Sequence, residues 1–436
     1  MNFEESVRYL YSLGNELLAM KLGLESIRLL AGAMGEPQLR FPAVHIAGTN
    51  GKGSTSAMIE AIARAAGVRT GLFTSPHLVS ITERVRVDGE AISEAEFAER
   101  ATRVREAGER LVAAGALPAP PTFFEQATMI AYLCFAERAV ELAVLEVGMG
   151  GRLDATNICR PVATAITRID YDHQEHLGDT LAAIAGEKAG ILKPGVPVVM
   201  APQAAEAREV IVARSRETGA PLIDGEARLR EAEILPAGDP RDLRQAGLHR
   251  LRLVDLDTRI NLRGRHQIEN AMTAILLAEA LRERGWAISR DAIGAGLDGV
   301  VWPGRLEMLS LGDSAPPLLL DGAHNPGGAI ALRGFLEAHC AGAPLTMIFG
   351  AMADKAVAEM AAMLFPLARR VILTRVDNPR ALDPARIAAA DARVLHTENV
   401  KDALDEAVRS TPAEGLICAC GSLYLLGEIR RLMGEA

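Results

Sequence analysis

The spacing of hydrophobic residues changes repeatedly along the chain between a helical and an extended period. Apolar residues recur near every 3.6 positions over residues 3–34, which predicts helix there. Compact apolar runs that are typical of buried strands end before Gly48, at Thr74 and at Val147, and helical patterns separate them. This alternation predicts an α/β protein with a largely parallel sheet.

Further elements follow in the first two thirds of the chain. Ser93, with Glu96 three residues later, predicts a capping box that opens a helix, and the Val85–Val87 run before an Asp-Gly turn predicts a hairpin. Strands are also expected at Pro161–Ile169 and Val196–Met200. The remaining helices are predicted at residues 55–66, 93–114, 122–137, 180–191, 203–218 and 264–284.

The pattern changes after residue 220. Short alternating runs within residues 221–263 predict small strands at 229–234, 251–254 and 259–262, which we expect to be added to the main sheet. Beyond Trp302 a second series of strands and helices has enough apolar residues for a core of its own. We therefore expect a larger domain at 1–297 and a smaller Rossmann-like domain at 298–436. Strands of the second series are predicted at 318–321, 345–349, 371–374, 393–395 and 416–419.

Composition narrows the class of protein. The 436 residues carry a formal net charge of −9, which disfavours nucleic acid as a partner but leaves room for a small anionic substrate. The five cysteines have no framework spacing, and Cys418 with Cys420 supplies too few ligands for a metal. No segment has the length of a membrane span, and the first residues do not read as a signal peptide. We expect a cytoplasmic monomer.

The clearest local signal is the glycine-rich turn between the first apolar strand and a helix. Its glycines let backbone N–H groups converge on an anion, the helix N-terminus adds positive partial charge, and Lys52 adds a full charge. The spacing is a variant, because Ile46 stands where the common phosphate-binding loop has glycine, and Gly53 separates Lys52 from Ser54. We predict phosphate binding by Gly48, Thr49, Asn50, Gly51, Lys52, Gly53 and Ser54.

Acidic residues follow two later strands. Glu146 ends an apolar strand beside a glycine-rich turn, where Mg²⁺ ligation is expected, although a solvated carboxylate would look the same. Asp170, Asp172 and His173 follow the next strand, where a structural and a metal-binding reading are equally open. This stretch shares only one Asp with the guanine-recognition motif of GTPases, which counts against GTP.

Three other features are ambiguous when taken alone. Ser75 before a proline is typical of a turn, and Lys188 would ordinarily be a solvated helix lysine. The Asp321–Pro326 segment closes a strand and opens a helix, so it reads equally well as a ligand site or as a capped Asn-Pro turn.

Together with the loop, a succession of short blocks runs through most of the chain. The blocks are His45–Ser54, Thr74–Leu78, Leu145–Asn157, Asp172–Gly178, Ala185–Gly195, Gly264–Ala271, Trp302–Glu307 and Asp321–Pro326. This succession resembles the folylpolyglutamate synthase/dihydrofolate synthase family, relatives of the Mur peptide ligases. The resemblance to the family is weakest over residues 204–260 and 380–415.

The resemblance implies roles for residues in every block. The glycine-rich loop would bind the ATP phosphates, with Lys52, Lys188 and His324 as catalytic residues, and domain 1–297 would bind ATP and the pterin. Ser75 and Glu146 would hold one Mg²⁺, and His173 a second together with Lys188, which would be carbamylated. The remaining implied contacts are Asn270, Arg305 and Asp321 with ATP, and Thr122, Phe123, Phe124, Glu125, Leu153, Asp154 and Ala155 with the pterin substrate.

The implied reaction joins L-glutamate to dihydropteroate or to reduced folates through an acyl phosphate formed from ATP. Closure of the domain at 298–436, on the glutamate side, would protect that intermediate from water. Two alternatives remain: a Mur-type ligase acting on another carboxylate, and a nucleotide-binding protein that ligates nothing. The first usually has a separate N-terminal domain, for which the lead before residue 48 is short, and the second would lack a second Rossmann-like domain. The sequence does not decide which folates are glutamylated.

Overall fold

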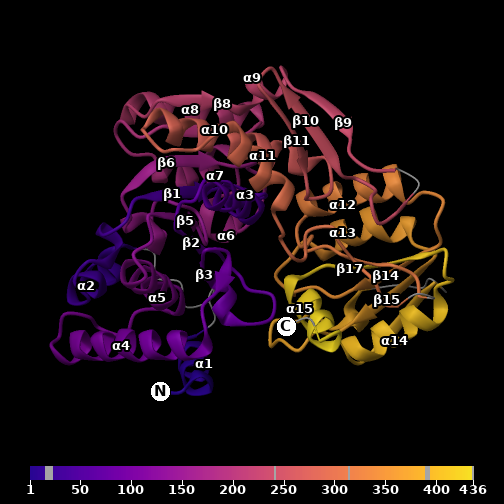
Figure 1. Ribbon diagram of the computed structural model, residues 1–436. Coiled ribbons are helices and arrows are strands. Elements are labelled where there is room, and N and C mark those ends of the chain that lie inside the picture. The colour runs from indigo at the N-terminus through magenta and orange to yellow at the C-terminus, as the bar shows by residue number, and fades with distance from the viewer. Residues whose placement is uncertain (15–22, 240–241, 313–314, 388–392, 435–436) are drawn as a thin grey trace. The chain divides into compact units, whose positions relative to one another are not determined.

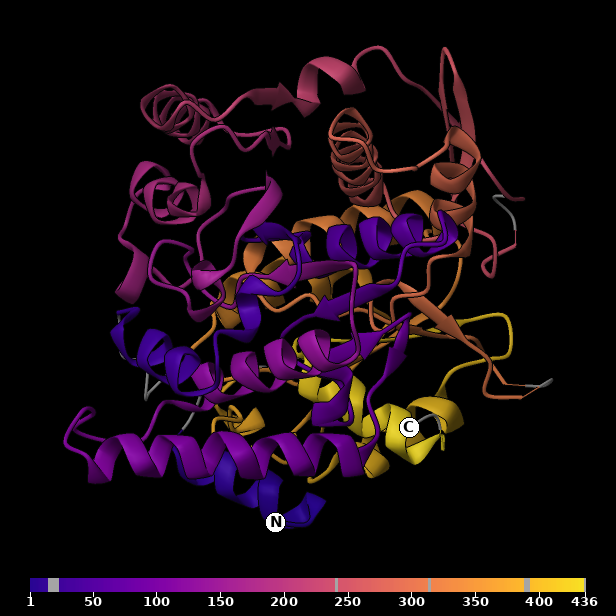
Figure 2. The same ribbon diagram turned by 60° about the vertical axis from the view of Figure 1, so that its left-hand side comes forward.

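The contacts within the protein divide it into two compact units. The computed structural model describes residues 1–14, 23–239, 242–312, 315–387 and 393–434 (Figures 1 and 2). The first unit is drawn mainly in indigo and magenta in Figure 1, and orange and yellow mark most of the second. The first consists of Met1–His77, Ile81–Glu231 and Glu269–Gly299, and the second of Leu78–Ser80, Ala232–Ile268 and Val300–Ala436.

The first unit is built on an eight-stranded sheet in the order β4-β3-β2-β5-β1-β6-β7-β8. The strands from β2 to β8 pair in parallel, and β3 and β4 add an antiparallel edge. Every residue of β1 and β5 is buried, as expected for central strands covered on both faces. The strands are β1 Ala43–Ala47, β2 Thr70–Phe73, β3 Val85–Val87, β4 Glu90–Ala91, β5 Leu142–Glu146, β6 Pro161–Ile166, β7 Val198–Met200 and β8 Leu222–Asp224.

Helices connect these strands, as the periodicity predicted. The capping box at Ser93 is present, because its side chain accepts from the Glu96 N–H and the Glu96 side chain accepts from the Ser93 N–H. The α-helices are α1 Phe3–Ser12, α2 Glu25–Ala33, α3 Lys52–Ala65, α4 Glu94–Ala113, α5 Phe123–Glu137, α6 Gln174–Leu177, α7 Leu181–Lys188, α8 Ala205–Thr218, α9 Gly225–Leu229, α10 His266–Glu283 and α11 Arg290–Gly299. The 3₁₀ turns are η1 Pro37–Leu39, η2 Ile81–Arg84, η3 Ala155–Ile158 and η4 Ala189–Ile191.

The prediction of continuous helix over residues 3–34 is wrong within the described residues. α1 ends at Ser12, and Gly14 follows with φ of +100°, a conformation that glycine adopts without strain and that no helix continues through. α2 begins only at Glu25, after Gly23 at φ of +159°. The middle of the predicted helix lies outside the described residues.

The second unit has its own six-stranded sheet in the order β12-β13-β17-β14-β15-β16. All neighbours pair in parallel except β12 with β13, so the expected Rossmann-like α/β unit is confirmed. Its strands are β12 Glu307–Leu309, β13 Leu318–Leu320, β14 Leu345–Phe349, β15 Arg370–Thr374, β16 Val394–Thr397 and β17 Leu416–Cys420. Its helices are α12 Pro326–His339, α13 Val357–Leu364, η5 Phe365–Leu367, η6 Pro384–Arg386, α14 Val400–Ser410 and α15 Leu423–Leu432.

β8, within residues 221–263, joins the main sheet, but the strands predicted at 229–234, 251–254 and 259–262 do not, so the expectation is wrong for those three. β9 (Glu233–Pro236), β10 (His249–Leu253) and β11 (Leu256–Ile260) form a separate antiparallel sheet that belongs to the second unit. Leu251 and Leu253 are buried while Arg250 and Arg252 are exposed. Antiparallel strands can be joined by short turns, so β9, β10 and β11 can pair with one another without joining the parallel sheet.

Three separate stretches of chain therefore build the second unit, whereas we expected the single range 298–436. The last of them begins at Val300, after α11. The first is the tripeptide Leu78–Ser80, whose backbone runs along α15: a Cβ on Gly427 would lie 1.9 Å from the Leu78 carbonyl oxygen. The Arg431 guanidinium also donates to the Val79 carbonyl oxygen at 3.2 Å.

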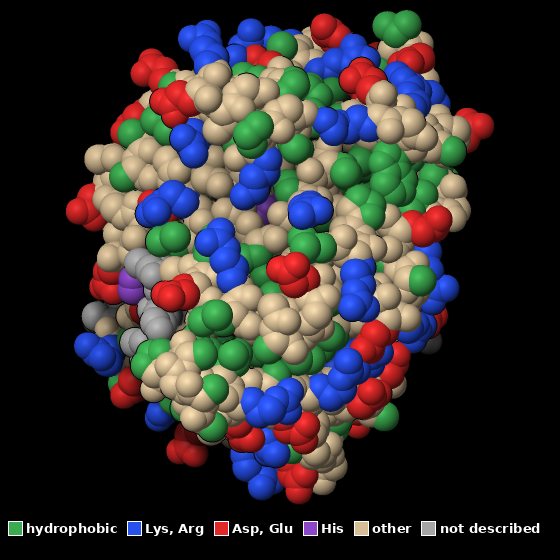
Figure 3. Space-filling model, turned by 90° about the vertical axis from the view of Figure 1, so that its left-hand side faces the viewer, with side chains coloured by type: hydrophobic (Ala, Val, Ile, Leu, Met, Phe, Trp, Pro, Cys, Tyr) green, Lys and Arg blue, Asp and Glu red, His purple; other side chains and the backbone are tan. Residues whose placement is uncertain are grey.

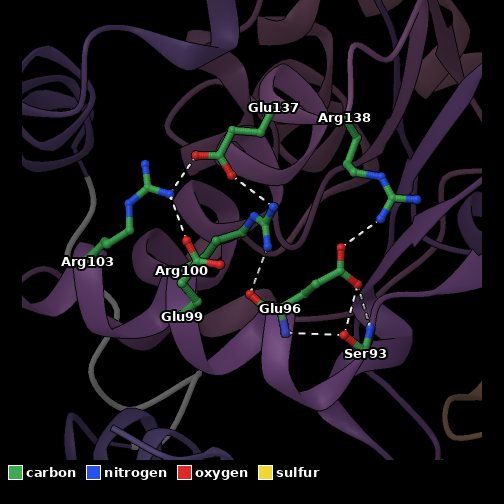
Figure 4. Close-up of polar contacts among 7 residues, drawn as sticks. All are labelled: Ser93, Glu96, Glu99, Arg100, Arg103, Glu137 and Arg138. Atoms are coloured by element: carbon green, nitrogen blue, oxygen red, sulfur yellow. Dashed lines mark hydrogen bonds and ion pairs between the residues drawn. The ribbon is translucent and has the colours of Figure 1, made fainter.

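The helix that precedes the expected pterin-binding block is held in place by a network of charged side chains (Figure 4). The Arg100 guanidinium lies within α4 with only 6% of its side chain exposed, 2.8 Å from Glu137 at the end of α5, and it also donates to the Glu96 carbonyl oxygen. Arg138 lies 2.7 Å from Glu96, and Arg103 lies 2.6 Å from Glu137. These pairs fix α5 against α4.

One face of the protein carries side chains of both charges. On the face shown in Figure 3, basic and acidic side chains are interspersed, and hydrophobic side chains occur in small groups. Among the described residues, no helix is both long and apolar enough to pass through a bilayer.

We expect Arg100→Met to lower the free energy of unfolding of the first unit by about 1–3 kcal/mol, because it removes the buried partner of Glu137. Arg214→Met is the matched control: Arg214 pairs with Glu217 on the exposed face of α8, with 45% of its side chain exposed. That control should cost less than about 0.5 kcal/mol. Urea unfolding measures both variants, and equal effects would contradict the structural role of the network.

Candidate ATP and substrate site

Three strand ends meet at one edge of the main sheet. β5 and β6 lie on either side of β1 in the sheet. After β1 the chain continues to β2, on the β5 side, and only later crosses to the opposite side to form β6. The carboxyl ends of parallel strands at such a switch point form the ligand-binding crevice of open α/β sheets. The glycine-rich loop follows β1, Glu146 is the last residue of β5, and the segment around Asp170 follows β6.

The glycine-rich loop adopts a turn that other residues could not form. Gly51 has φ of +89°, and a Cβ at this position would lie 2.2 Å from the Asn270 amide oxygen. A Cβ on Gly48 would lie 1.9 Å from the Thr167 hydroxyl oxygen. α3 starts immediately afterwards at Lys52, so the loop leads into a helix N-terminus, which favours anions.

The loop is held by the backbone that follows β6. The N–H groups of Thr49 and Asn50 both donate to the Arg168 carbonyl oxygen, at 2.9 and 3.1 Å. The Thr49 hydroxyl donates to the Asp170 carbonyl oxygen at 3.0 Å and accepts from the Asp170 N–H at 3.1 Å. The Lys52 ammonium donates to the Thr49 carbonyl oxygen at 3.1 Å. These contacts fix the loop before any ligand arrives.

Lys188 is the least expected member of the site from its sequence position alone. It ends α7, is buried, and donates from Nζ to the Gly48 carbonyl oxygen at 2.8 Å. Its pKa is lowered to about 7, mainly by burial and next by the charge of Lys52, while the charges of Asp172 and Asp154 oppose the shift. A substantial fraction of the amine is therefore neutral near pH 7.

Glu146 and Ser75 lie together, as expected from the sequence. Glu146 is the last residue of β5, pairs in register with Ile46 of β1, and is 5% exposed. Its Oε2 accepts from the Ser75 backbone N–H at 3.1 Å. A buried carboxylate beside a hydroxyl residue and a phosphate loop is a suitable oxygen-donor set for Mg²⁺.

His173 lies just beyond the loop contacts. It precedes α6 in the left-handed conformation, with φ of +52°, and its N–H donates to the Asp172 carboxylate at 3.0 Å. The imidazole Nε2 is 3.9 Å from the same carboxylate oxygen, and about a quarter of the side chain is exposed.

Acidic side chains alone do not form a complete Mg²⁺ site here, so other oxygen donors are needed. Within the described ranges, no three His, Cys, Asp or Glu side chains are grouped to hold a metal. Mg²⁺ is commonly held by one or two carboxylates together with water and substrate phosphates, so Glu146 and Ser75 can suffice for one ion. A carbamate on Lys188 would add oxygen donors, and its lowered pKa fits that reaction, since only the neutral amine reacts with CO₂.

The expected pterin block Thr122–Glu125 is in part a helix cap. The Thr122 hydroxyl accepts from the Glu125 N–H at 3.3 Å, and the Glu125 carboxylate accepts from the Thr122 N–H at 2.7 Å, which is a capping box. Phe123 is buried between Tyr11, whose ring centroid lies 5.5 Å away, and Arg84. Phe124 remains partly exposed, and its ring lies where a Cβ on Gly148 would be.

The second expected pterin block, Leu153–Ala155, lies where the glycine-rich turn after β5 leads into η3, with Asp154 as the N-cap and Ala155 as the first residue of η3. Asp154 is 7% exposed, and burial raises its pKa, although hydrogen bonds from Thr156 and from backbone N–H groups oppose the shift. One carboxylate oxygen accepts from the Thr156 N–H at 2.9 Å, and the other accepts from the Met149 N–H at 3.0 Å. Leu153 is half-buried and Ala155 is buried.

Asp321 and Arg305 meet at the end of β13 in the second unit. The Asp321 carboxylate accepts from the Leu306 and Ala323 N–H groups, both at 3.0 Å. Burial raises the pKa of Asp321 to about 6, and the charge of Arg305 opposes this shift. The Arg305 guanidinium lies against Gly322, where a Cβ would be 2.0 Å from Nη1.

His324 and Asn325 follow in the same turn. The His324 Nδ1 is 2.8 Å from the Gly322 carbonyl oxygen, so Nδ1 carries a proton and donates to that oxygen. The Asn325 side chain accepts from the Gly328 N–H at 2.8 Å and caps α12. The cap and a ligand site thus occupy adjacent residues and do not exclude each other.

The sequence reasoning gave no role to His45 or Thr156, although both lie within quoted blocks. His45 is fully buried in β1 and lies 2.8 Å from the Thr156 hydroxyl. The signal in the sequence that could have indicated a role was His45 itself, a titratable residue in the middle of an apolar strand.

Comparisons with known proteins agree with this arrangement. Residues 46–278 match the Mur ligase middle domain, and residues 304–423 match the Mur ligase glutamate ligase domain. Dihydrofolate synthase/folylpolyglutamate synthase of Bacillus subtilis is 34% identical over 96% of both chains. Folylpolyglutamate synthase of Lacticaseibacillus casei is 35% identical over 99% of both chains.

Solved structures give the same result. A Mycobacterium tuberculosis folylpolyglutamate synthase complexed with ADP superposes with a TM-score of 0.88 at 32% identity, covering 100% of this chain and 98% of the other. E. coli FolC in complex with DHPP and ADP has a TM-score of 0.85 at 28% identity, with the same coverage. Because the likeness extends over nearly the full length of each relative and over both units, the chain belongs to the folylpolyglutamate synthase/dihydrofolate synthase family of Mur ligases.

Proposed function

We propose that this protein uses ATP to join L-glutamate to dihydropteroate, to reduced folates, or to both. The observation that carries the proposal is the convergence of the glycine-rich loop, Glu146 with Ser75, and the buried Lys188 at neighbouring strand ends. This edge of the sheet brings together, within the first unit, anion-binding amides, oxygen donors and the Lys188 amine, whose pKa is lowered to about 7. Family membership supports the same activity.

A carboxylate is a poor electrophile, so it must be activated before it meets an amine. In the first step, an oxygen of the folate-side carboxylate attacks the γ-phosphorus of ATP, the bond to the β-phosphate oxygen breaks, and ADP leaves. In the second step, the glutamate nitrogen attacks the acyl carbon, phosphate leaves, and the nitrogen loses a proton as the amide forms. The first step brings two anions together, so positioning and charge neutralisation dominate catalysis.

We assign the phosphate contacts to the glycine-rich loop. Its first N–H groups are occupied by the Arg168 carbonyl oxygen, which leaves the N-terminus of α3 and the Lys52 ammonium as the groups to face ATP. Lys52 would leave its present acceptor, the Thr49 carbonyl oxygen, for a phosphate oxygen, a stronger charge-assisted partner.

Two Mg²⁺ ions would supply the remaining positive charge. Ser75 and Glu146 would hold one of them, and His173 together with a carbamylated Lys188 would hold the second. The ions would draw electron density from the γ-phosphate and so favour its transfer. The residues fit this role in donor type and burial.

The other roles stay predictions that rest on the family resemblance. Asn270 packs against Gly51 of the loop within the first unit. Arg305, Asp321 and His324 lie in the second unit, and their contacts with nucleotide and glutamate are inferred. The expectations of a monomer, and of no nucleic-acid partner, stay predictions as well.

The substrate range can be read directly from products. With ATP, Mg²⁺ and glutamate, we expect both dihydropteroate and tetrahydrofolate to gain glutamate, each with matched release of ADP. Mass spectrometry of separate reactions distinguishes the two activities. Release of ADP that needs neither the folate-side substrate nor glutamate would contradict ligation.

Lys188→Ala should lose most activity, and acetate should restore part of it by supplying carboxylate oxygens near the loop. Because the neutral amine is the reactive form and the pKa is about 7, added bicarbonate should also stimulate the native enzyme more at about pH 8 than at about pH 6. Lys401→Ala, an exposed lysine paired with Asp405, is the control and should behave as the native enzyme. Full activity of Lys188→Ala without acetate would exclude the carbamate.

Glu146→Gln should raise the Mg²⁺ concentration needed for half-maximal activity on the order of tenfold to 100-fold, because it removes the anionic ligand. Glu141 lies just before the same strand and accepts from the Arg69 N–H, so Glu141→Gln is the matched control. An unchanged Mg²⁺ titration for Glu146→Gln would remove this residue from the metal site.

A further inference from the structure

A chain of three polar side chains crosses the buried interior of the first unit. His45 lies in the middle of β1 and is fully buried, and its Nε2 is 2.8 Å from the Thr156 hydroxyl oxygen. Thr156 is fully buried as well, and its hydroxyl donates to one oxygen of the Asp154 carboxylate. The chain therefore links the strand that leads into the phosphate loop with the turn that holds the expected pterin contacts.

The direction of every hydrogen bond in this chain is fixed. The Thr156 hydroxyl has one proton and gives it to the Asp154 carboxylate, so it must accept from His45, whose Nε2 carries the proton. The opposite ring nitrogen, Nδ1, has no partner among the described residues. An unpaired buried acceptor is less costly than an unpaired N–H donor, which favours the same tautomer.

The neighbours of Thr156 hold the turn rather than compete for its hydroxyl. The Tyr132 hydroxyl donates to the Thr156 carbonyl oxygen at 2.8 Å, and the Lys193 ammonium donates to the Asn157 side chain at 2.7 Å. The second oxygen of Asp154 accepts from the Met149 N–H. Thr156 thus orients the Asp154 carboxylate, and the carboxylate in turn holds the backbone of the glycine-rich turn at Met149.

That backbone bears directly on the expected substrate contacts. Phe124 lies against Gly148, with its ring atom Cζ 2.4 Å from where a Cβ on Gly148 would be. A shift of the turn would therefore move both the Asp154 carboxylate and the surface on which Phe124 rests. The glycine-rich phosphate loop has supports of its own, because the N–H groups of Thr49 and Asn50 donate to the backbone after β6.

We propose that His45 and Thr156 are positioning residues that set affinity for the folate-side substrate and leave affinity for ATP nearly unchanged. The inference rests on the proposed function, because it assigns the turn at Asp154 to the folate-side substrate. Neither residue touches the substrate: the imidazole holds the hydroxyl, and the hydroxyl holds the carboxylate.

The test compares variants that break the chain with variants that keep it. Thr156→Val and His45→Leu remove one link each, whereas Thr156→Ser keeps the hydroxyl and His45→Gln keeps an N–H donor at a similar reach. Thr128→Val is the matched control, because the Thr128 hydroxyl is buried on α5 and has no hydrogen-bond partner in the described part of the chain. For each, KM is measured separately for dihydropteroate and for ATP, together with kcat and the melting temperature.

We expect Thr156→Val and His45→Leu each to raise KM for dihydropteroate by roughly tenfold while KM for ATP stays within about twofold. The double variant should be no worse than the poorer single one, since both break the same chain. Thr156→Ser, His45→Gln and Thr128→Val should stay within about threefold of the native KM for dihydropteroate.

Two outcomes would overturn the inference: an equal rise of both KM values, or an unchanged KM for dihydropteroate in folded Thr156→Val and His45→Leu. If either variant does not fold, the comparison uses Thr156→Ser and His45→Gln, which keep the hydrogen bonds. A rise of roughly tenfold in KM for dihydropteroate in these two variants would also contradict the inference. A native enzyme that glutamylates neither dihydropteroate nor tetrahydrofolate would instead refute the proposed function.

Discussion

The parallel register of β5, β1 and β6 is the constraint on which the site depends. It sets Glu146 opposite Ile46 and brings the backbone after β6 against the glycine-rich loop, where one carbonyl oxygen, that of Arg168, accepts from two loop N–H groups. Side chains alternate along a strand, so a slip of one residue would turn Glu146 to the other face of the sheet. The chemistry is therefore positioned by backbone pairing before any side chain takes part.

Both units place a buried carboxylate where a strand ends and satisfy it with backbone N–H groups. Asp321 accepts from two such groups after β13, and Asp154 accepts from Met149 and Thr156 after β5. Burial disfavours the charged form in each case, and Lys188 shows the corresponding effect for a cation. Charges held in this way cost folding free energy, which is why groups with strongly shifted pKa values concentrate where function requires them.

The local features could be predicted from sequence, and the long-range ones could not. The glycine-rich loop, the capping box at Ser93 and the strand that ends at Glu146 depend on neighbouring residues, and the structure has them where the pattern indicated. The burial of Lys188 depends on Gly48, far away along the chain, so periodicity suggested a solvated lysine until the family resemblance was considered. The separate sheet of β9 to β11 was missed for the same reason, since a pattern of alternation does not name the partner strand.

The assembly of the second unit from separate stretches of chain has a consequence for synthesis. Leu78–Ser80 is made long before Gly427 and Arg431, the residues that it packs against. The second unit therefore cannot reach these native contacts until Arg431 has been made, whereas β2 and β3, on either side of the tripeptide, belong to a sheet whose strands are all made earlier. The order in which the chain is made thus separates the folding of the two units in time.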